Sequence, residues 1–143
     1  MQTERTGNMI SLLYVSTSRL EPAACHAEVS ALVRDSVVFN AARHITGALI
    51  FTGTHFVQVL EGEEQVIQAL LSSLKRDRRH ADLVVMKQEQ ITERGFESWS
   101  MAYSGPSQFV SRRVNRMLND PSPTELQRSS EWLIDLLRRF AAD

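Results

Sequence analysis

Apolar and polar positions follow two kinds of pattern along this chain, which together predict five strands and four helices. Short runs rich in β-branched and aromatic residues predict strands, and apolar residues that recur every three or four positions predict amphipathic helices. The predicted strands are 9–16, 45–52, 55–61, 82–91 and 98–104. The predicted helices run from 23 to about 40, from 63 to 79, from 109 to 118 and from 126 to 140, the last with Ser122 or Thr124 as its N-cap.

The order strand–helix–strand–strand–helix–strand–strand predicts an α+β fold, a ferredoxin-like βαββαββ sheet with two helices on one face. In the strand 55–61, Phe56, Gln58 and Leu60 point to one face and two valines to the other. Because the first two helices can cover only one face, we expect the two C-terminal helices to cover the other. We therefore divide the chain into a flexible tail at 1–8, a core at 9–104 and a two-helix extension at 105–143.

Gln58 stands out because it lies in the middle of the apolar segment FVQVLEG. A buried amide without partners costs about 1–3 kcal/mol, so something must satisfy it. Tyr14, in the segment SLLYVS, falls on the helix-facing side of the first strand, which lies beside the third in a ferredoxin-like sheet. A Tyr14–Gln58 hydrogen bond is therefore expected, either as plain core structure or, since one hydroxyl leaves part of the amide free, as part of a ligand site.

Three further features each have a structural and a functional interpretation. Asn40, near the end of the first helix, is either a helix C-cap or an amide that reaches into the space near Gln58. Arg79, in KRDRRH, belongs either to a solvated helix end or to a site for an anionic or carbonyl-bearing ligand. Trp99 and Met101 share one face of the fifth strand, where core packing is the simpler interpretation.

Composition narrows the function classes. The net charge of −1 gives no reason to expect nucleic acid or an anionic membrane as a partner, and no apolar run reaches the length of a membrane span. The single cysteine excludes an intrachain disulfide, the four histidines lack metal-ligand spacing, and no glycine-rich phosphate loop is present. We expect a cytoplasmic protein that is not an enzyme and holds no metal.

Several motifs occur in one order: Tyr14, Asn40, TGAL at 46–49, FVQVLEG at 56–62, RDRRH at 76–80 and WSM at 99–101. As an ordered set they resemble the BLUF family of blue-light sensors that use flavin. The resemblance implies a flavin between the first two helices and the sheet, FAD in the first instance, with FMN and riboflavin as alternatives. The flavin-binding residues that it implies are Tyr14, Ser36, Asn40, Gln58, Asp77, Arg79 and His80.

The same resemblance implies a photochemical mechanism. Excited flavin takes an electron and a proton from Tyr14, the Gln58 amide rotates or tautomerises, and absorption shifts to the red. Trp99 and Met101 then relay the change to the C-terminal helices, where a partner protein or a homo-oligomer receives it, since residues after 104 leave no room for a cyclase or phosphodiesterase domain. The alternatives are a small acyl phosphate hydrolase built on Arg79 and Asn40, and an interaction module without photochemistry.

Overall fold

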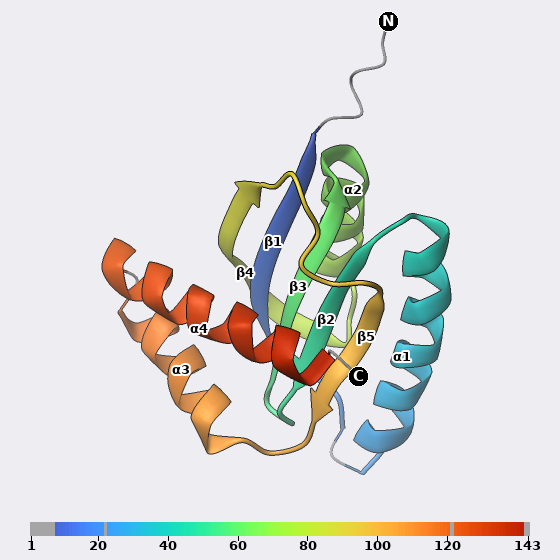
Figure 1. Ribbon diagram of the computed structural model, residues 1–143. Helices are drawn as coiled ribbons and strands as arrows, with labels where there is room; N and C mark the ends of the chain where they lie inside the picture. The colour runs from blue at the N-terminus through green and yellow to red at the C-terminus, as the bar shows by residue number, and fades with distance from the viewer. Residues whose placement is uncertain (1–7, 22, 121, 142–143) are drawn as a thin grey trace, which may run out of the picture.

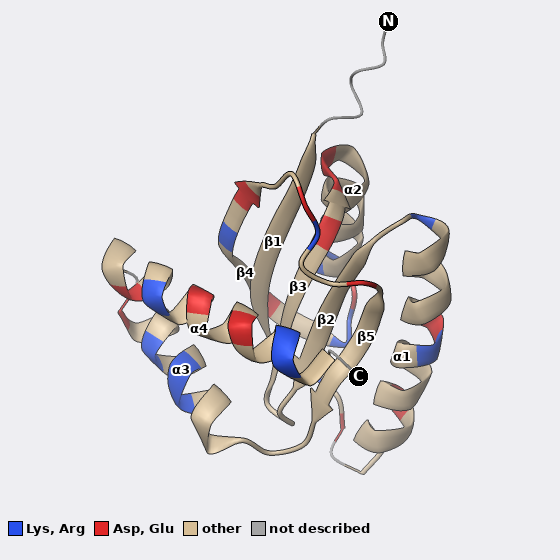
Figure 2. Ribbon diagram, viewed as in Figure 1, with Lys and Arg blue, Asp and Glu red and all other residues tan. Residues whose placement is uncertain are grey.

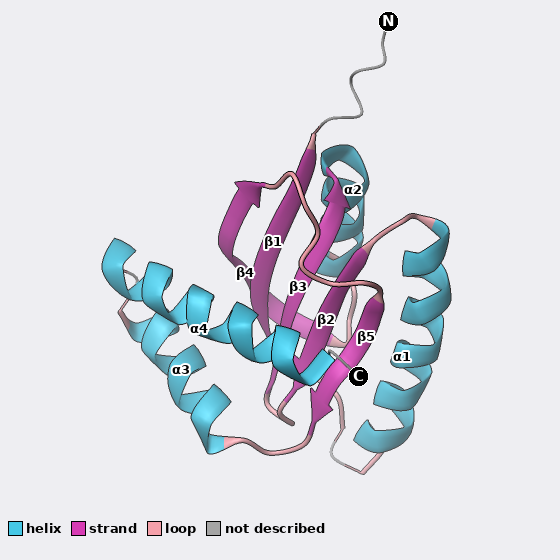
Figure 3. Ribbon diagram, in the orientation of Figure 1, coloured by secondary structure: helices cyan, strands magenta, loops and turns pink. Residues whose placement is uncertain are grey.

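The computed structural model describes residues 8–21, 23–120 and 122–141, and it places a five-stranded sheet between two pairs of helices (Figures 1 and 3). Its elements are β1 (Met9–Ser18), α1 (Cys25–Ala42), β2 (Thr46–Phe51), β3 (His55–Glu63), α2 (Glu64–Lys75), β4 (His80–Gln90), β5 (Trp99–Ser104), α3 (Gln108–Asn119) and α4 (Pro123–Ala141). The α+β fold expected from the pattern is confirmed. Apart from Asn8, the expected N-terminal tail lies outside the described residues.

The sheet has the strand order β4-β1-β3-β2-β5. β1 lies antiparallel to β3, as predicted, and their register places Tyr14 directly opposite Gln58. β2 pairs with β3 antiparallel and with β5 parallel, so β5 forms one edge of the sheet and β4 the other. The register of β2 and β5 aligns Gly47 with Trp99, which places Trp99 one strand away from β3.

The alternation along the strands divides the interior into two cores. Leu12, Tyr14, Phe56 and Leu60 pack beneath α1 and α2 in the first core. The residues between them in sequence pack beneath α3 and α4 in the second core: Leu13, Val15, Val57 and Val59. The prediction that the C-terminal helices cover the second face is therefore confirmed, and α4 crosses that face in Figure 1.

The ends of the first two helices differ from the predicted ends. α1 continues to Ala42, and the backbone N–H groups of His44 and Ile45 bond the carbonyls of Ala41 and Asn40 at 3.3 and 2.9 Å. This is a Schellman motif, with His44 in the left-handed conformation at φ 56°. The interpretation of Asn40 as the capping residue is therefore wrong, because His44 has that place and Asn40 keeps helical backbone geometry.

α2 ends at Lys75, four residues before the predicted end at Arg79. Asp77 terminates the helical continuation, since its carboxylate accepts a hydrogen bond from the Arg79 backbone N–H at 2.9 Å. Such local side-chain bonds compete with the helix for the backbone donors. Asp77 and Arg79 therefore lie in a turn over the sheet and not on the solvent-exposed face of a helix.

The two C-terminal helices begin at serine N-caps. Ser107 Oγ accepts from the Val110 backbone N–H at 3.2 Å, and Ser122 Oγ accepts from the Glu125 backbone N–H at 3.3 Å, which decides between the two predicted caps of α4. α3 buries Val110, Val114 and Met117 and leaves Phe109 exposed. None of the helices within the described ranges combines the length and the apolar character needed to cross a membrane.

Candidate functional site

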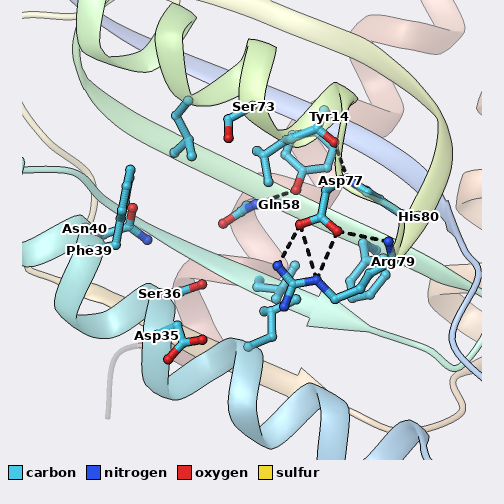
Figure 4. A pocket seen from close by; sticks show the side chains of 15 residues that line it. Tyr14, Asp35, Ser36, Phe39, Asn40, Gln58, Ser73, Asp77, Arg79 and His80 are labelled. Atoms are coloured by element: carbon cyan, nitrogen blue, oxygen red, sulfur yellow. Dashed lines mark hydrogen bonds and ion pairs between the residues drawn. The ribbon is translucent and has the colours of Figure 1, made fainter.

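A pocket opens between α1, α2 and the first face of the sheet (Figure 4). All seven residues that sequence reasoning assigned to a cofactor line this pocket: Tyr14, Ser36, Asn40, Gln58, Asp77, Arg79 and His80. They come from β1, α1, β3, the turn after α2 and the start of β4, so the fold gathers residues that are far apart in the sequence. Trp99 and Met101 do not line the pocket but pack in the same core beside it.

A chain of three hydrogen-bonded side chains begins in the pocket and ends in the core beside it. Gln58 Nε2 donates to the Tyr14 hydroxyl at 2.5 Å, and Trp99 Nε1 donates to Gln58 Oε1 at 2.8 Å. The indole N–H can only donate, so it fixes the amide with its oxygen toward Trp99 and its nitrogen toward Tyr14. This arrangement leaves the second Nε2 hydrogen and the Tyr14 hydroxyl hydrogen for another partner. Burial raises the pKa of the Tyr14 phenol, which keeps it neutral.

The Asn40 side chain carries a buried hydrogen-bond acceptor without a donor among the described residues. Its side chain is 3% exposed and lines the pocket from the last turn of α1. Within the described part of the chain, Asn40 Oδ1 has no hydrogen-bond partner. A buried acceptor without a donor costs free energy, and such groups in folded proteins are rare. The carbonyl of the same residue accepts hydrogen bonds in the Schellman motif, which fixes the backbone of Asn40 at this place.

Asp77 and Arg79 form an ion pair at the mouth of the pocket. The guanidinium donates to both carboxylate oxygens, with Arg79 Nη2 at 2.6 Å from Asp77 Oδ2. The hydrogen bond from Arg79 lowers the pKa of Asp77, and the same bond raises the pKa of Arg79. The ion pair orients the guanidinium while part of it stays open to the pocket. The hydrolase interpretation needs an arginine that can grip a phosphate with both arms, whereas Nε and Nη2 of Arg79 are engaged by Asp77.

His80 closes the far end of the pocket. Its Nε2 lies 2.6 Å from the Leu74 carbonyl, which can only accept, so Nε2 carries a hydrogen and donates. In the neutral ring Nδ1 then accepts from the Ser16 hydroxyl at 2.6 Å. The ring also meets Phe56 edge to face at 5.7 Å. These contacts tie the end of α2 to β1 and hold the wall of the pocket in place.

Sequence reasoning missed Asp35 and Ser73, which also line the pocket. Both could have been found from helical spacing, because Asp35 lies four residues before Phe39 on α1 and Ser73 lies three residues after Leu70 on α2. The remaining lining residues are apolar: Leu32, Phe39, Leu49, Phe56, Leu70 and Leu74. A pocket with mainly apolar walls and several polar side chains suits an aromatic ligand that carries carbonyl and N–H groups.

Comparison with known families gives one match, which covers most of the chain. The BLUF family, described as sensors of blue-light using FAD, matches residues 9–102. Among curated proteins, the photoactivated adenylate cyclase subunit alpha of Euglena gracilis is 30% identical over 92 residues, 64% of this chain and 9% of that protein. The chain therefore spans less than a tenth of the length of this relative.

Solved structures resemble most of the chain. The dark-state structure of BlrB, a BLUF protein, is 28% identical, covers 94% of this chain and 98% of its own, and gives a TM-score of 0.68. The photo-activated state of BlsA is 24% identical over 91% of this chain and 94% of its own, with a TM-score of 0.72, which supports the fold.

Proposed function

The chain belongs to the BLUF family, the sensors of blue light that use FAD, and from this premise we propose that the pocket holds a flavin and that Tyr14 and Gln58 convert its excitation into a hydrogen-bond change. The observation that carries the proposal is the chain of contacts from Tyr14 through Gln58 to Trp99, beside a pocket with an unpartnered Asn40 oxygen. FAD is the proposed form, with FMN and riboflavin as alternatives. We also propose that 9–104 forms the flavin-binding part.

The residues of the pocket fit a flavin. One edge of its ring system presents two carbonyl groups on either side of an N–H, and Asn40 offers an unpartnered acceptor for that N–H together with an amide donor for a carbonyl. Arg79, oriented by Asp77, suits the second carbonyl. The free Nε2 hydrogen of Gln58 suits the remaining acceptors along this edge. The leucines and phenylalanines of the walls would cover the two ring faces.

When bound, a flavin supplies absorption of blue light and, once excited, a strong one-electron oxidant. Tyr14 is the electron donor in our proposal. Burial raises the pKa of its phenol, so the side chain is neutral before light and must release its proton when it loses an electron. Gln58 Nε2 donates to this hydroxyl at 2.5 Å, and the amide takes part in the proton transfer once it turns and presents Oε1, an acceptor, to Tyr14. Within the described residues, no titratable side chain hydrogen-bonds the Tyr14 hydroxyl.

Return of the electron and proton leaves the Gln58 amide turned around. In the turned amide Oε1 faces Tyr14, which now donates, and Nε2 faces the indole N–H of Trp99. Two donors then oppose each other across a 2.8 Å contact, so Trp99 loses its acceptor in a site where it is 5% exposed. An unpaired buried donor costs about 1–3 kcal/mol, which drives Trp99 and with it β5 away from the original position.

We propose that this movement of β5 is the output of the domain. β5 is an edge strand that contacts α4, and Tyr103 of β5 packs on Phe140 of α4 with the ring centroids 6.2 Å apart. A downstream protein or a second copy of the chain would read the change on the exposed surface of α3 and α4, in the cytoplasm.

The variant Tyr14→Phe tests the assigned roles. It removes the hydroxyl and keeps the ring, so we expect flavin binding to stay within about threefold of the parent protein, since apolar walls and Asn40 remain. The light-induced red shift of the flavin absorption should be lost, because the electron and proton donor is gone. The measurement is a flavin titration followed by absorption spectra before and after blue light. A Tyr14→Phe protein with an unchanged red shift would refute the proposed mechanism.

A further inference from the structure

Glu61 is a buried acid that the proposed photochemistry does not use. It lies three residues after Gln58 in β3, so its side chain points to the opposite face of the sheet, where it is 3% exposed. Its carboxylate accepts from Thr46 Oγ1 at 2.8 Å, from the Gly95 backbone N–H at 2.7 Å and from the Phe96 backbone N–H at 3.2 Å. A buried charge of this kind depends on such donors for its stability.

Two of these donors belong to the loop 91–98, which joins β4 to β5 and crosses the same face of the sheet as α4 in Figure 1. Arg94 of this loop reinforces the attachment, because its guanidinium donates to Thr46 Oγ1 at 2.8 Å and to the Glu61 carbonyl at 3.1 Å. β3 therefore holds the segment 95–99 from both faces, with Glu61 at Gly95 and Phe96 and with Gln58 at Trp99.

The loop also separates Glu61 from a cation on α4. A Cβ placed on Gly95 would lie 3.2 Å from Glu61 Oε2 and 2.9 Å from Arg138 Nε, so the acid and the base approach one point beside the Gly95 backbone. These two side chains form no ion pair in the structure described for 8–141. Figure 2 shows basic residues in the C-terminal part of α4 close to the loop, and Phe96 packs in the same core as Leu133 and Leu137.

We propose that Glu61 is a positioning residue that couples β5 to α4 by exchanging partners, which deepens the proposed function and rests on it. While Trp99 is bound to Gln58, the carboxylate holds the Gly95 and Phe96 amides. When β5 is displaced it carries these amides away, and the carboxylate, which keeps only the Thr46 hydroxyl of these three donors, takes the guanidinium of Arg138. The new ion pair draws the C-terminal half of α4 toward the sheet, because Arg138 is exposed before the exchange. The output is a shift of α4.

The experiment compares hydrogen exchange of the backbone amides in darkness and under blue light, with the flavin spectrum recorded in parallel. In the parent protein, light should speed exchange of Gly95 and Phe96 about tenfold and change exchange in 133–141. Arg138→Gln should keep the red shift and the faster loop exchange but lose the response of α4. Glu61→Gln should keep the red shift, show fast loop exchange already in darkness, and also lose the response of α4.

Arg139→Gln is the matched control, because Arg139 is the next residue, is exposed and pairs with Asp135 at 3.0 Å. It should behave as the parent protein.

An α4 response that survives in Arg138→Gln or in Glu61→Gln would overturn the coupling. A parent protein without any red shift would overturn the proposed function instead. In that case Trp99→Phe tests the coupling, because it removes the Gln58 contact without light. Hydrogen exchange of α4 in darkness should change in Trp99→Phe and stay unchanged in the double variant Trp99→Phe/Arg138→Gln. An equal change in both proteins would overturn the coupling.

Discussion

Replacement of Asn40 by alanine should have opposite effects on the empty and on the flavin-loaded protein. In the empty protein the change removes a buried acceptor that has no donor within the described residues, and it places a better helix former in the last turn of α1. Removal of an unpaired buried group relieves up to about 1 kcal/mol, and the better helix propensity adds about 0.5 kcal/mol. We therefore expect the empty Asn40→Ala protein to be more stable than the parent protein by about 1 kcal/mol.

In the loaded protein the sign reverses, because Asn40 would accept from and donate to the flavin. Loss of two hydrogen bonds costs about 1–3 kcal/mol, which corresponds to flavin binding that is about five- to 150-fold weaker. The assays are urea unfolding of the flavin-free protein and titration of flavin by fluorescence quenching. Asn115→Ala is the control, since Asn115 is exposed inside α3 and reports helix propensity alone. A variant of Asn40 that destabilises the empty protein and binds flavin as tightly as the parent would refute the assignment.

Three further predictions concern the indole contact, a buried hydroxyl and the ion pair. Trp99→Phe removes a bond worth about 0.5–1.5 kcal/mol that favours the dark amide, so the spectrum in darkness should gain a red-shifted component, while Trp132→Phe, on the other face, should leave it unchanged. Ser130 Oγ is buried without a partner in the described structure, so Ser130→Ala should raise the urea midpoint, and a lower midpoint would contradict this account. Because the pKa of Asp77 is lowered, its pairing with Arg79 stabilises the folded protein above the ordinary value of 3.8 and ceases to do so as the pH falls further. The stability difference between the parent and Asp77→Asn should therefore be constant near neutral pH and fall as the pH drops below 3.8; a difference that does not change with pH in that range would contradict the assignment.

The sheet and its two cores could be predicted because each strand carries its own alternation. Gln58 is an example of what this alternation predicts. The period of two placed Gln58 on the helix-facing side of the sheet, and the pairing of β1 with β3 then placed Tyr14 opposite it. The C-terminal helices were placed correctly for the same reason, since Val57 and Val59 required cover.

The ends of the helices could not be predicted correctly, because individual hydrogen bonds and backbone conformations in the turns determine where a helix ends. Charge pattern alone extends α2 to Arg79, whereas the Asp77 carboxylate captures the Arg79 backbone N–H and ends the helix earlier. The sequence left two interpretations of Asn40 open, and the one that made it the C-cap of α1 is wrong, because His44 adopts the left-handed geometry. The hydrogen-bond partners of Glu61 could not be predicted from the sequence either. Gly95 and Phe96 follow a strand whose pairing depends on the complete sheet.

The most direct test of the central claim is the absorption spectrum of the flavin-loaded protein, recorded in darkness, directly after blue light and during recovery. The claim is that Tyr14 and Gln58 turn excitation of a flavin in this pocket into a reversible hydrogen-bond change. It predicts that the main visible band shifts to the red under blue light, keeps the shape of an oxidised flavin and returns in darkness. A protein that takes up no flavin, or one whose bound flavin shows no reversible red shift, would contradict it.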